Sequence, residues 1–143
     1  MLEIVNTTDD DAAEKLFASD PAHLDYGWTK GCVIVYTMAR SAELVGQGIR
    51  MNAVAPGATD TNFFITPMTE KALELSTGQW GAMATPEEMA WPLLYLASPA
   101  ASYVSGVNLV VDAAAFGGYV TGLLEAPPSA AYSKVREPWG IGF

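Results

Sequence analysis

The sequence is poor in the residues that build disulfides and metal sites. Its 143 residues include one cysteine, Cys32, and one histidine, His23. A single cysteine permits no internal disulfide and no cysteine-based zinc site. His23 lies in a polar stretch beside Pro21, which favours a structural role for it. We therefore expect neither a disulfide nor a bound metal.

Positive charge and long apolar runs are also scarce. The chain has 7 basic and 16 acidic residues, a net charge of −9 and a pI near 4.3. This balance argues against nucleic acid or an anionic membrane as a partner. No apolar run reaches the ~18 residues that span a bilayer, and the acidic start is unlike a secretory signal. Because half of the residues are hydrophobic, we expect a folded, cytoplasmic protein.

Two helices are predicted in the first third of the chain. The acidic run at 9–11 predicts a short helix that Asp10 or Asp11 caps and that continues through Phe17. Residues 26–45 contain no proline and are followed by glycines, which predicts a long helix. Its middle, residues 32–36, is apolar on every side, so we expect it to be buried all round.

The second half predicts strands separated by helices. The apolar runs 49–55 and 107–111 predict two strands of a parallel sheet that is covered on both faces. Between them we expect a helical flap over 62–76, a loop over 77–84 and a helix over 86–97, the last begun by a Thr85 cap and a capping box. The tail from Ala113 is rich in glycine and proline, so we expect no regular structure there. Two strands cannot bury such faces alone, so the chain is predicted to be part of a larger α/β domain.

Tyr26 and Lys30 carry the most informative spacing. They are four residues apart, which places them on one face of the first turn of the long helix. A free tyrosine has a pKa of about 10, and a nearby ammonium favours the phenolate. A phenol held in this way can take a proton from an alcohol as hydride leaves. By itself the spacing is common on helices, where it usually means an exposed lysine beside a half-buried tyrosine.

The blocks that follow give this pair a context. Residues 48–61, 95–106 and 110–112 read GIRMNAVAPGATDT, YLASPAASYVSG and VVD. Together with Tyr26 and Lys30 they resemble the short-chain dehydrogenase/reductase family, because the motifs follow one another in the family's order and at its usual separations. The resemblance covers residues 26–112, the C-terminal half of such an enzyme, and implies a doubly wound parallel sheet of Rossmann type. It assigns Tyr26 as the catalytic tyrosine and Lys30 as the lysine that binds the nicotinamide ribose.

The same resemblance implies a cofactor-binding turn. Pro56 and Gly57 match the turn that passes the nicotinamide, and Ala58 would offer its backbone to the carboxamide. Thr59 and Thr61 stand where the family contacts the carboxamide and the cofactor phosphates. Their hydroxyls can donate to amide or phosphate oxygens, although both are also ordinary turn residues.

Residues 62–82 correspond to the family's mobile substrate flap. Phe63, Phe64, Met68 and Trp80 would give this flap an apolar lining, which suggests a hydrophobic alcohol or ketone as substrate. These four side chains could equally belong to the core.

Several family features are missing from the sequence. No strand is followed by a glycine-rich turn and a helix, which is the unit that binds the dinucleotide, and the catalytic asparagine is absent. The catalytic serine usually precedes the tyrosine by about a dozen residues, where Ala13 stands, and Ser19 is too close. Residues 1–25 resemble the insertion of the branch that contains 3α-hydroxysteroid and coniferyl-alcohol dehydrogenases. We therefore expect the C-terminal half of a dehydrogenase of ~250 residues, with 113–143 as a tail.

The resemblance implies an NAD- or NADP-dependent oxidoreductase that interconverts an alcohol, such as a hydroxysteroid or an aromatic alcohol, and its carbonyl. The isolated chain is then expected to be an inactive fragment. The alternative is a non-catalytic, truncated member that acts as a subunit-interaction module. In the family, the helix that begins at Tyr26 contributes to a subunit interface, so a homodimer or homotetramer is expected.

Overall fold

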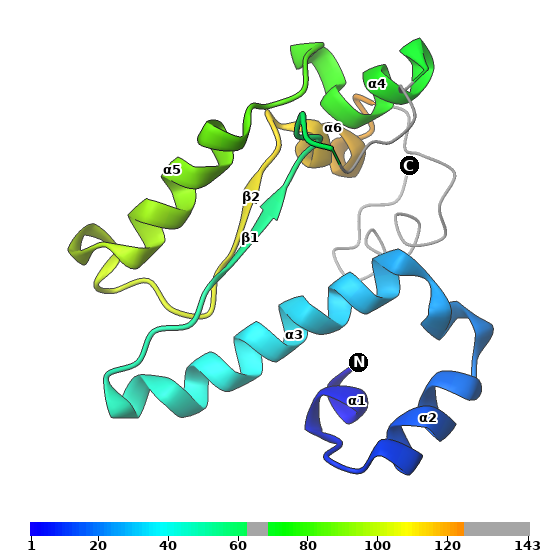
Figure 1. Ribbon diagram of the computed structural model, residues 1–143, viewed down its shortest axis with the longest axis vertical. Coiled ribbons are helices and arrows are strands. Elements are labelled where there is room, and N and C mark those ends of the chain that lie inside the picture. Colours follow the sequence, from blue (N-terminus) through cyan, green and yellow to red (C-terminus); the bar gives the residue numbers. More distant parts are fainter. Residues whose placement is uncertain (63–68, 125–143) are drawn as a thin grey trace. The chain divides into compact units, whose positions relative to one another are not determined.

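The computed structural model describes residues 1–62 and 69–124, apart from the side chains of Ala22 and Leu24. The chain forms two compact units. The first contains Met1–Ala53 and Val104–Asn108, and the second contains Val54–Tyr103 and the described part of Leu109–Phe143. Figure 1 follows the described residues through their helices and strands.

The first unit is mainly helical. Its elements are α1 (Leu2–Asn6), α2 (Asp10–Ala18), η1 (Pro21–Leu24), α3 (Tyr26–Leu44) and η2 (Val45–Gln47). The predicted short helix is present as α2, but the prediction of its cap was wrong by one or two residues. Asp9 caps it, because its carboxylate accepts hydrogen bonds from the amides of Asp11 and Ala12. Asp10 and Asp11 lie in the first turn, at the positive end of the helix dipole.

The predicted long helix is confirmed as α3, but its expected burial on all sides is wrong. The apolar side chains Val33, Tyr36 and Met38 are exposed, Met38 to 57%. The buried residues of the helix are instead the small polar Thr37 and Ser41. Their hydroxyls donate to backbone carbonyls of the same helix, which makes their burial inexpensive.

Close contacts at two glycines show where other segments of this unit cover α3. At Gly31 of α3, an added Cβ would lie 2.6 Å from the side chain of Met1, just before α1. Gly106 has a φ of 80°, and an added Cβ there would lie 2.6 Å from the Ser41 hydroxyl. The start of the chain and the 104–108 segment therefore approach α3 closely.

The two strands pair in parallel. They are β1 (Ala53–Pro56) and β2 (Asn108–Val111), which lie side by side in Figure 1. The Ala53 amide donates to the Val107 carbonyl and the Gly57 amide to the Val111 carbonyl, both at 2.9 Å, so the register is the same at both ends. The prediction of 49–55 started this strand too early.

The later start of β1 has a side-chain cause. Asn52 donates from Nδ2 to the Val104 carbonyl at 2.9 Å and accepts at Oδ1 from the Val107 amide at 3.1 Å. The Met51 amide likewise donates to the Ser105 hydroxyl. Before Ala53, hydrogen bonds from side chains to the backbone thus replace part of the backbone pairing between the two strands.

The connection between the strands supplies several helices of the second unit. It passes through α4 (Glu70–Thr77), η3 (Gly78–Trp80), α5 (Pro86–Ala97) and η4 (Pro99–Ala101). The predicted capping box of α5 is confirmed: the Glu88 amide donates to Thr85 Oγ1, and the Thr85 amide donates to Glu88 Oε2 at 2.7 Å. The loop predicted over 77–84 is corrected, because it includes the short helix η3. Of the predicted flap, residues 63–68 lie outside the described residues.

The tail prediction was also wrong, because a helix, α6 (Ala115–Thr121), follows β2. The Asp112 carboxylate accepts from the Phe116 amide at 2.7 Å and so satisfies one of the free amides at the start of the helix. Ala115 and Tyr119 of α6 are buried, where the helix packs against α4 and η3.

The core formed by the described residues is small. Its buried apolar side chains are Leu96, Ala101, Ala115 and Tyr119. Large apolar side chains such as Trp91 and Tyr103 are exposed. No helix among the described residues combines the length and apolar character needed to cross a membrane.

Candidate active site

The structure brings Tyr26 and Lys30 together at the start of α3. Tyr26 is the first residue of the helix and is 70% exposed. Lys30 lies one turn further along, and its Nζ is 5.3 Å from the centroid of the Tyr26 ring. This distance is within the range of a cation–π contact. The pair thus presents a phenol and an ammonium on one accessible face.

The first turn that carries this pair is well capped. The Asp25 carboxylate accepts from the amides of Gly27, at 2.8 Å, and Trp28, at 3.2 Å. The Thr29 hydroxyl donates to the Tyr26 carbonyl at 2.8 Å. An aspartate at this position also interacts favourably with the helix dipole.

The other reactive side chains of the first unit have structural roles. Ser19 donates its hydroxyl to the Leu16 carbonyl at 2.7 Å, which closes the end of α2. His23 Nδ1 lies 2.7 Å from the same carbonyl, and its ring packs against Trp28. Burial raises the pKa of the Cys32 thiol, and the positive chain terminus offsets this only in part. The thiol is therefore a poor nucleophile.

Gly57 lies at the carboxyl end of β1, in close contact with the end of β2. An added Cβ would lie 2.8 Å from Asp112 Cα and 2.9 Å from Asp112 Cβ. Backbone atoms cannot move away cheaply, so only glycine fits here. The resemblance explains Gly57 by approach to a nicotinamide, whereas the structure gives a reason within the chain itself.

The turn after Gly57 is fixed by a second, short parallel pairing. Thr59 forms a bridge with Ala84, the Ala84 amide donates to the Ala58 carbonyl, and the Asp60 amide donates to the Ala84 carbonyl. The Thr59 hydroxyl donates to the Gly57 carbonyl at 3.1 Å. The Ala58 carbonyl and the Thr59 hydroxyl proton therefore already have partners within the chain.

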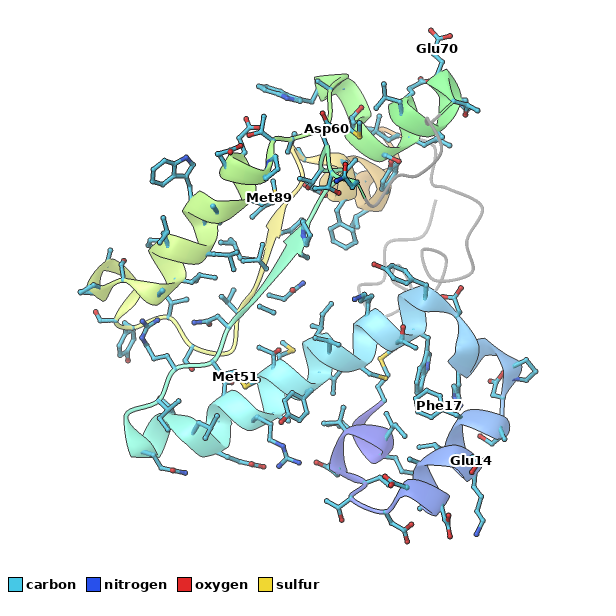
Figure 2. The ribbon with its side chains drawn as sticks, viewed as in Figure 1. Glu14, Phe17, Met51, Asp60, Glu70 and Met89 are labelled. Carbon is cyan, nitrogen blue, oxygen red and sulfur yellow. The ribbon has the colours of Figure 1, made fainter. Side chains whose placement is uncertain are left out.

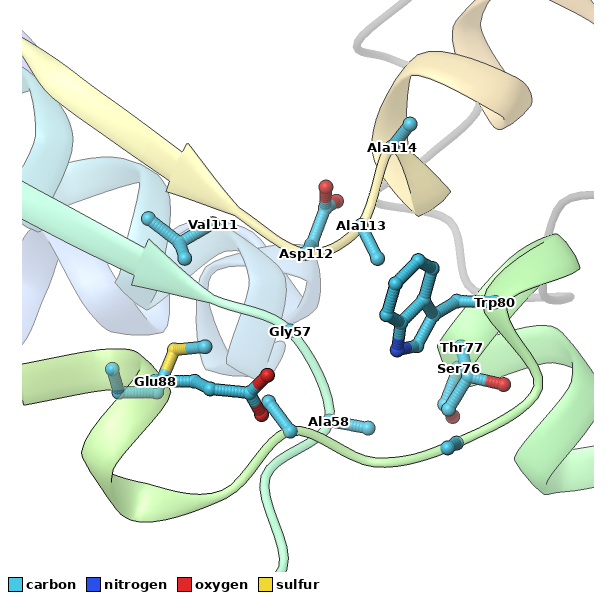
Figure 3. Close-up of a pocket in the computed structure, with 13 residues that line it drawn as sticks. Gly57, Ala58, Ser76, Thr77, Trp80, Glu88, Val111, Asp112, Ala113 and Ala114 are labelled. Atoms are coloured by element: carbon cyan, nitrogen blue, oxygen red, sulfur yellow. The ribbon is translucent and has the colours of Figure 1, made fainter. Parts of the chain in front are cut away.

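A pocket of about 530 Å³ lies at the carboxyl ends of the two strands. Figure 3 shows Gly57 and Ala58 at its base, with the Trp80 indole and the Glu88 side chain approaching from opposite sides. Ligands of open α/β sheets bind at this edge, and small-molecule pockets measure roughly 300–1,000 Å³. The second unit therefore contains a pocket whose volume and position at the strand ends suit a small-molecule ligand.

The charges on the pocket wall have one sign. Glu88 and Asp112 line it, and none of its described lining residues is basic. Both carboxylates also serve a helix: Glu88 closes the capping box of α5, and Asp112 accepts from the amide of Phe116 in α6. Trp80 adds a broad apolar face and is 68% exposed. This lining favours neutral or cationic ligands over anions.

Two further lining residues have unusual backbone conformations. Ala113 and Ala114 have φ values of 52° and 67°, in the left-handed region that favours glycine. Asp112 and Glu88 were not predicted as pocket residues, and only their places beside a strand end and a helix start could have indicated them.

The predicted site residues thus fall into four groups. Tyr26 and Lys30 meet in the first unit, and Gly57, Ala58 and Trp80 line the pocket of the second. Phe63, Phe64 and Met68 lie outside the described residues. Thr61 follows in the bend after the turn, and Pro56 ends β1. In the described part of the chain, no three potential ligands gather closely enough to hold a metal ion.

Comparison with known proteins identifies the family. The family model described as enoyl-(acyl carrier protein) reductase matches residues 3–115. The chain belongs to the short-chain dehydrogenase/reductase family. Its α/β fold with a parallel sheet agrees with that of a solved family member.

Three relatives illustrate the similarity. A 3-oxoacyl-(acyl-carrier-protein) reductase FabG from Thermotoga maritima is 41% identical over 65% of this chain and 38% of its own length. A 3-alpha-hydroxysteroid dehydrogenase/carbonyl reductase from Comamonas testosteroni is 35% identical over 63% of this chain and 37% of its own length. A crystal structure of a short-chain type dehydrogenase/reductase from Mycobacterium marinum has a TM-score of 0.55 and 36% identity, over 60% of this chain and 34% of that one. The chain thus spans less than two fifths of the length of these relatives.

Proposed function

We propose that this chain supplies the proton-transfer part of an NAD- or NADP-dependent oxidoreductase that interconverts an alcohol and its carbonyl compound. The observation that carries the proposal is the Tyr26–Lys30 pair, with Nζ 5.3 Å from the ring centroid, in a chain of this family. The relatives include reductases and dehydrogenases.

Tyr26 is assigned the acid–base step. In the oxidation direction its Oη takes the hydroxyl proton of the alcohol, and in reduction it returns a proton to the carbonyl oxygen. Lys30, whose ammonium lies over the Tyr26 ring, is available to a ribose hydroxyl. The exposure of Tyr26 leaves its Oη accessible to a substrate.

The described residues fit only the nicotinamide end of a dinucleotide. When bound, the nicotinamide gives or accepts the hydride. Gly57 and Ala58 would border that ring, in a pocket whose volume of about 530 Å³ accommodates a ring and a small substrate. Ala58 would offer its amide to the carboxamide, since its carbonyl is occupied by Ala84. Among the described residues, no strand leads through a glycine-rich turn into a helix, so the pyrophosphate needs another segment.

We assign a neutral, apolar alcohol or ketone as substrate. Support comes from the Trp80 face, the small alanines of the pocket and the two carboxylates Glu88 and Asp112. The similarity to a hydroxysteroid dehydrogenase agrees with a ring-bearing substrate. A substrate with its own carboxylate would be repelled by the acidic wall.

The chain matches less than two fifths of the length of its relatives, and this supports a further part of the proposal. We assign the chain to the C-terminal half of the doubly wound fold, with residues 1–25 as an insertion before the catalytic helix. The 143 residues alone would then bind dinucleotide weakly and be inactive. The catalytic assay therefore uses the longest reading frame that contains these 143 residues.

The decisive experiment compares two tyrosines of the same helix. Tyr26→Phe is expected to lower the turnover of NADH- or NADPH-dependent ketone reduction about 10²–10⁴-fold, the usual contribution of an acid–base group. Tyr36→Phe, on the exposed side of α3, is the matched control and should leave turnover unchanged. Retained turnover in Tyr26→Phe removes this residue from the mechanism.

Binding is measured separately from turnover. The purified 143-residue chain is titrated with NADH and NADPH, followed by nicotinamide fluorescence beside a sizing column. Saturable binding would show that the chain rebuilds a dinucleotide site without a glycine-rich turn, contrary to the assignment above.

A second candidate function is a non-catalytic interaction module. The exposed Val33 and Tyr36 favour it, because they lie one turn apart on α3 and neighbouring apolar side chains on a surface commonly mark an interface. Under this alternative the chain forms a homodimer or homotetramer through α3, and Val33→Glu breaks the assembly. A reading frame with no glycine-rich turn upstream, together with inactivity, would favour the module over the enzyme.

A further inference from the structure

Three aromatic side chains from separate elements meet beside the start of α3. They are Phe17 of α2, His23 of η1 and Trp28 of α3, which we call the aromatic cluster. The Phe17 and Trp28 rings have centroids 5.5 Å apart at an angle of 74°, and those of His23 and Trp28 are 4.3 Å apart at 32°. Figure 2 shows Phe17 on α2, on the side that faces α3. Trp28 is thus in contact with a ring from each of two other elements.

A hydrogen bond fixes one member of the cluster to α2. His23 Nδ1 lies 2.7 Å from the Leu16 carbonyl oxygen. Because a carbonyl oxygen only accepts, Nδ1 must carry the proton and donate it. His23 is therefore anchored to the end of α2 while its ring packs on α3. The 3-10 helix η1 forms the connection between these two helices.

The cluster reaches the turn that contains Tyr26. The amides of Gly27 and Trp28 both donate to the Asp25 carboxylate, so Trp28 is a member of the capping arrangement. Tyr26 lies between the Asp25 cap and the clamped Trp28. Its own ring is mostly exposed, and its described neighbour is the Lys30 ammonium of the same turn. The direction of its side chain therefore depends on the backbone of this turn.

We propose that the aromatic cluster positions the Tyr26–Lys30 pair by holding the first turn of α3 in its helical form. The inference rests on the proposed function of that pair. Helix ends fray when nothing holds them, because their first amides lack partners within the helix. Phe17, His23 and Trp28 are positioning residues here, since they act on the pair only through the backbone of the first turn.

The test measures hydrogen exchange of individual amides in the full 143-residue chain by NMR. Trp28→Ala is expected to speed exchange at positions 27–30 about tenfold, because two aromatic contacts that hold the first turn are lost. Exchange in the middle of α3, at Thr37 and Ser41, should stay unchanged. Trp91→Ala, at a tryptophan 68% exposed on α5, is the matched control and should change neither.

Conservative variants separate positioning from a general loss of stability. Trp28→Phe keeps a ring against Phe17 and His23 and should restore most of the protection. His23→Asn keeps a donor near the Nδ1 position without the ring, and His23→Phe keeps the ring without the donor. Each is expected to give an intermediate acceleration at positions 27–30. Equal acceleration along all of α3, or none at its first turn, would overturn the proposal.

The catalytic arm uses the longest reading frame that contains this chain. Trp28→Phe should retain turnover, whereas Trp28→Ala should lower kcat about tenfold with little change in the KM for NADH or NADPH, because misplaced groups slow the chemical step. If exchange changes as expected while Tyr26→Phe stays active, the proposed function fails and the positioning role fails with it. If Tyr26→Phe is inactive but exchange does not respond to Trp28→Ala, only the inference about the cluster fails.

Discussion

Gly57 and Asp112 lie in direct backbone contact at the carboxyl ends of the two paired strands. The Gly57 amide donates to the carbonyl of the residue before Asp112, and an added Cβ would come within 2.8 Å of Asp112 Cα. The same aspartate then accepts from the Phe116 amide at the start of α6. One close contact therefore joins the turn after β1, the end of β2 and the next helix.

The first prediction concerns this contact. Gly57→Ala should lower the free energy of unfolding by about 1–3 kcal/mol, the usual cost of forcing an extra carbon into a filled space. Urea unfolding followed by tryptophan fluorescence measures it. Gly46→Ala is the control: nothing lies within 4 Å of its added Cβ, and its stability should be equal or up to ~1 kcal/mol higher. Equal stability of Gly57→Ala and the parent chain would contradict the contact.

The second prediction concerns the two alanines in left-handed conformation. Ala113→Gly and Ala114→Gly should each raise the free energy of unfolding by roughly 0.5–1 kcal/mol, because glycine adopts positive φ without the steric cost that alanine has. Ala115→Gly, a buried position in α6, should instead lower it by about 1 kcal/mol. Thermal melting of the three variants side by side shows whether each substitution stabilises or destabilises the chain. Destabilisation by all three would argue against the positive φ values.

The third prediction concerns Asn52, whose amide bonds both Val104 and Val107. Asn52→Ala should lower the free energy of unfolding by about 2 kcal/mol, since two part-buried hydrogen bonds are lost. Asn52→Asp keeps the acceptor for the Val107 amide but loses the donor to the Val104 carbonyl, so an intermediate value is expected. Asn62→Ala, at an exposed position, should change stability by less than about 0.5 kcal/mol.

The fourth prediction concerns the pH dependence of Cys32. Burial raises the pKa of its thiol in the folded chain, so the thiol stays protonated to higher pH than in the unfolded chain. Alkylation by iodoacetamide should therefore reach half its maximal rate at a higher pH in buffer than in concentrated urea. This group contributes stability below the ordinary pKa of a thiol, and that contribution is lost as pH rises through the folded-state pKa. Cys32→Ser gives the unlabelled baseline, and coincident profiles would refute the shift.

Local features were the most predictable from the sequence. The start of α3 at Tyr26 and the capping box of α5 were found because caps, prolines and glycines act within one helical turn. The spacing of Tyr26 and Lys30 also follows from a single turn of helix. The family resemblance required only that several such blocks follow in order.

Features that depend on distant residues were missed. The helix α6 is begun by the Asp112 carboxylate and covered by α4 and η3, so its glycine-rich sequence alone predicted an irregular tail. The burial of α3 was overestimated, because a run of apolar residues does not show how many neighbours will cover it. Asp112 and Glu88 became pocket residues only when the two strand ends and the start of α5 came together.

The sequence by itself determined the family, the helices α2, α3 and α5, the two predicted strands, and the pairing of a phenol with an ammonium on the first turn of α3. These follow from short-range geometry and from motifs along the chain. Tertiary structure alone decided that Gly57 is required by Asp112, that Trp28 is held between Phe17 and His23, and that the pocket wall is acidic. The reason is physical: steric exclusion, ring packing and summed charge act between atoms close in space, whatever their separation along the chain.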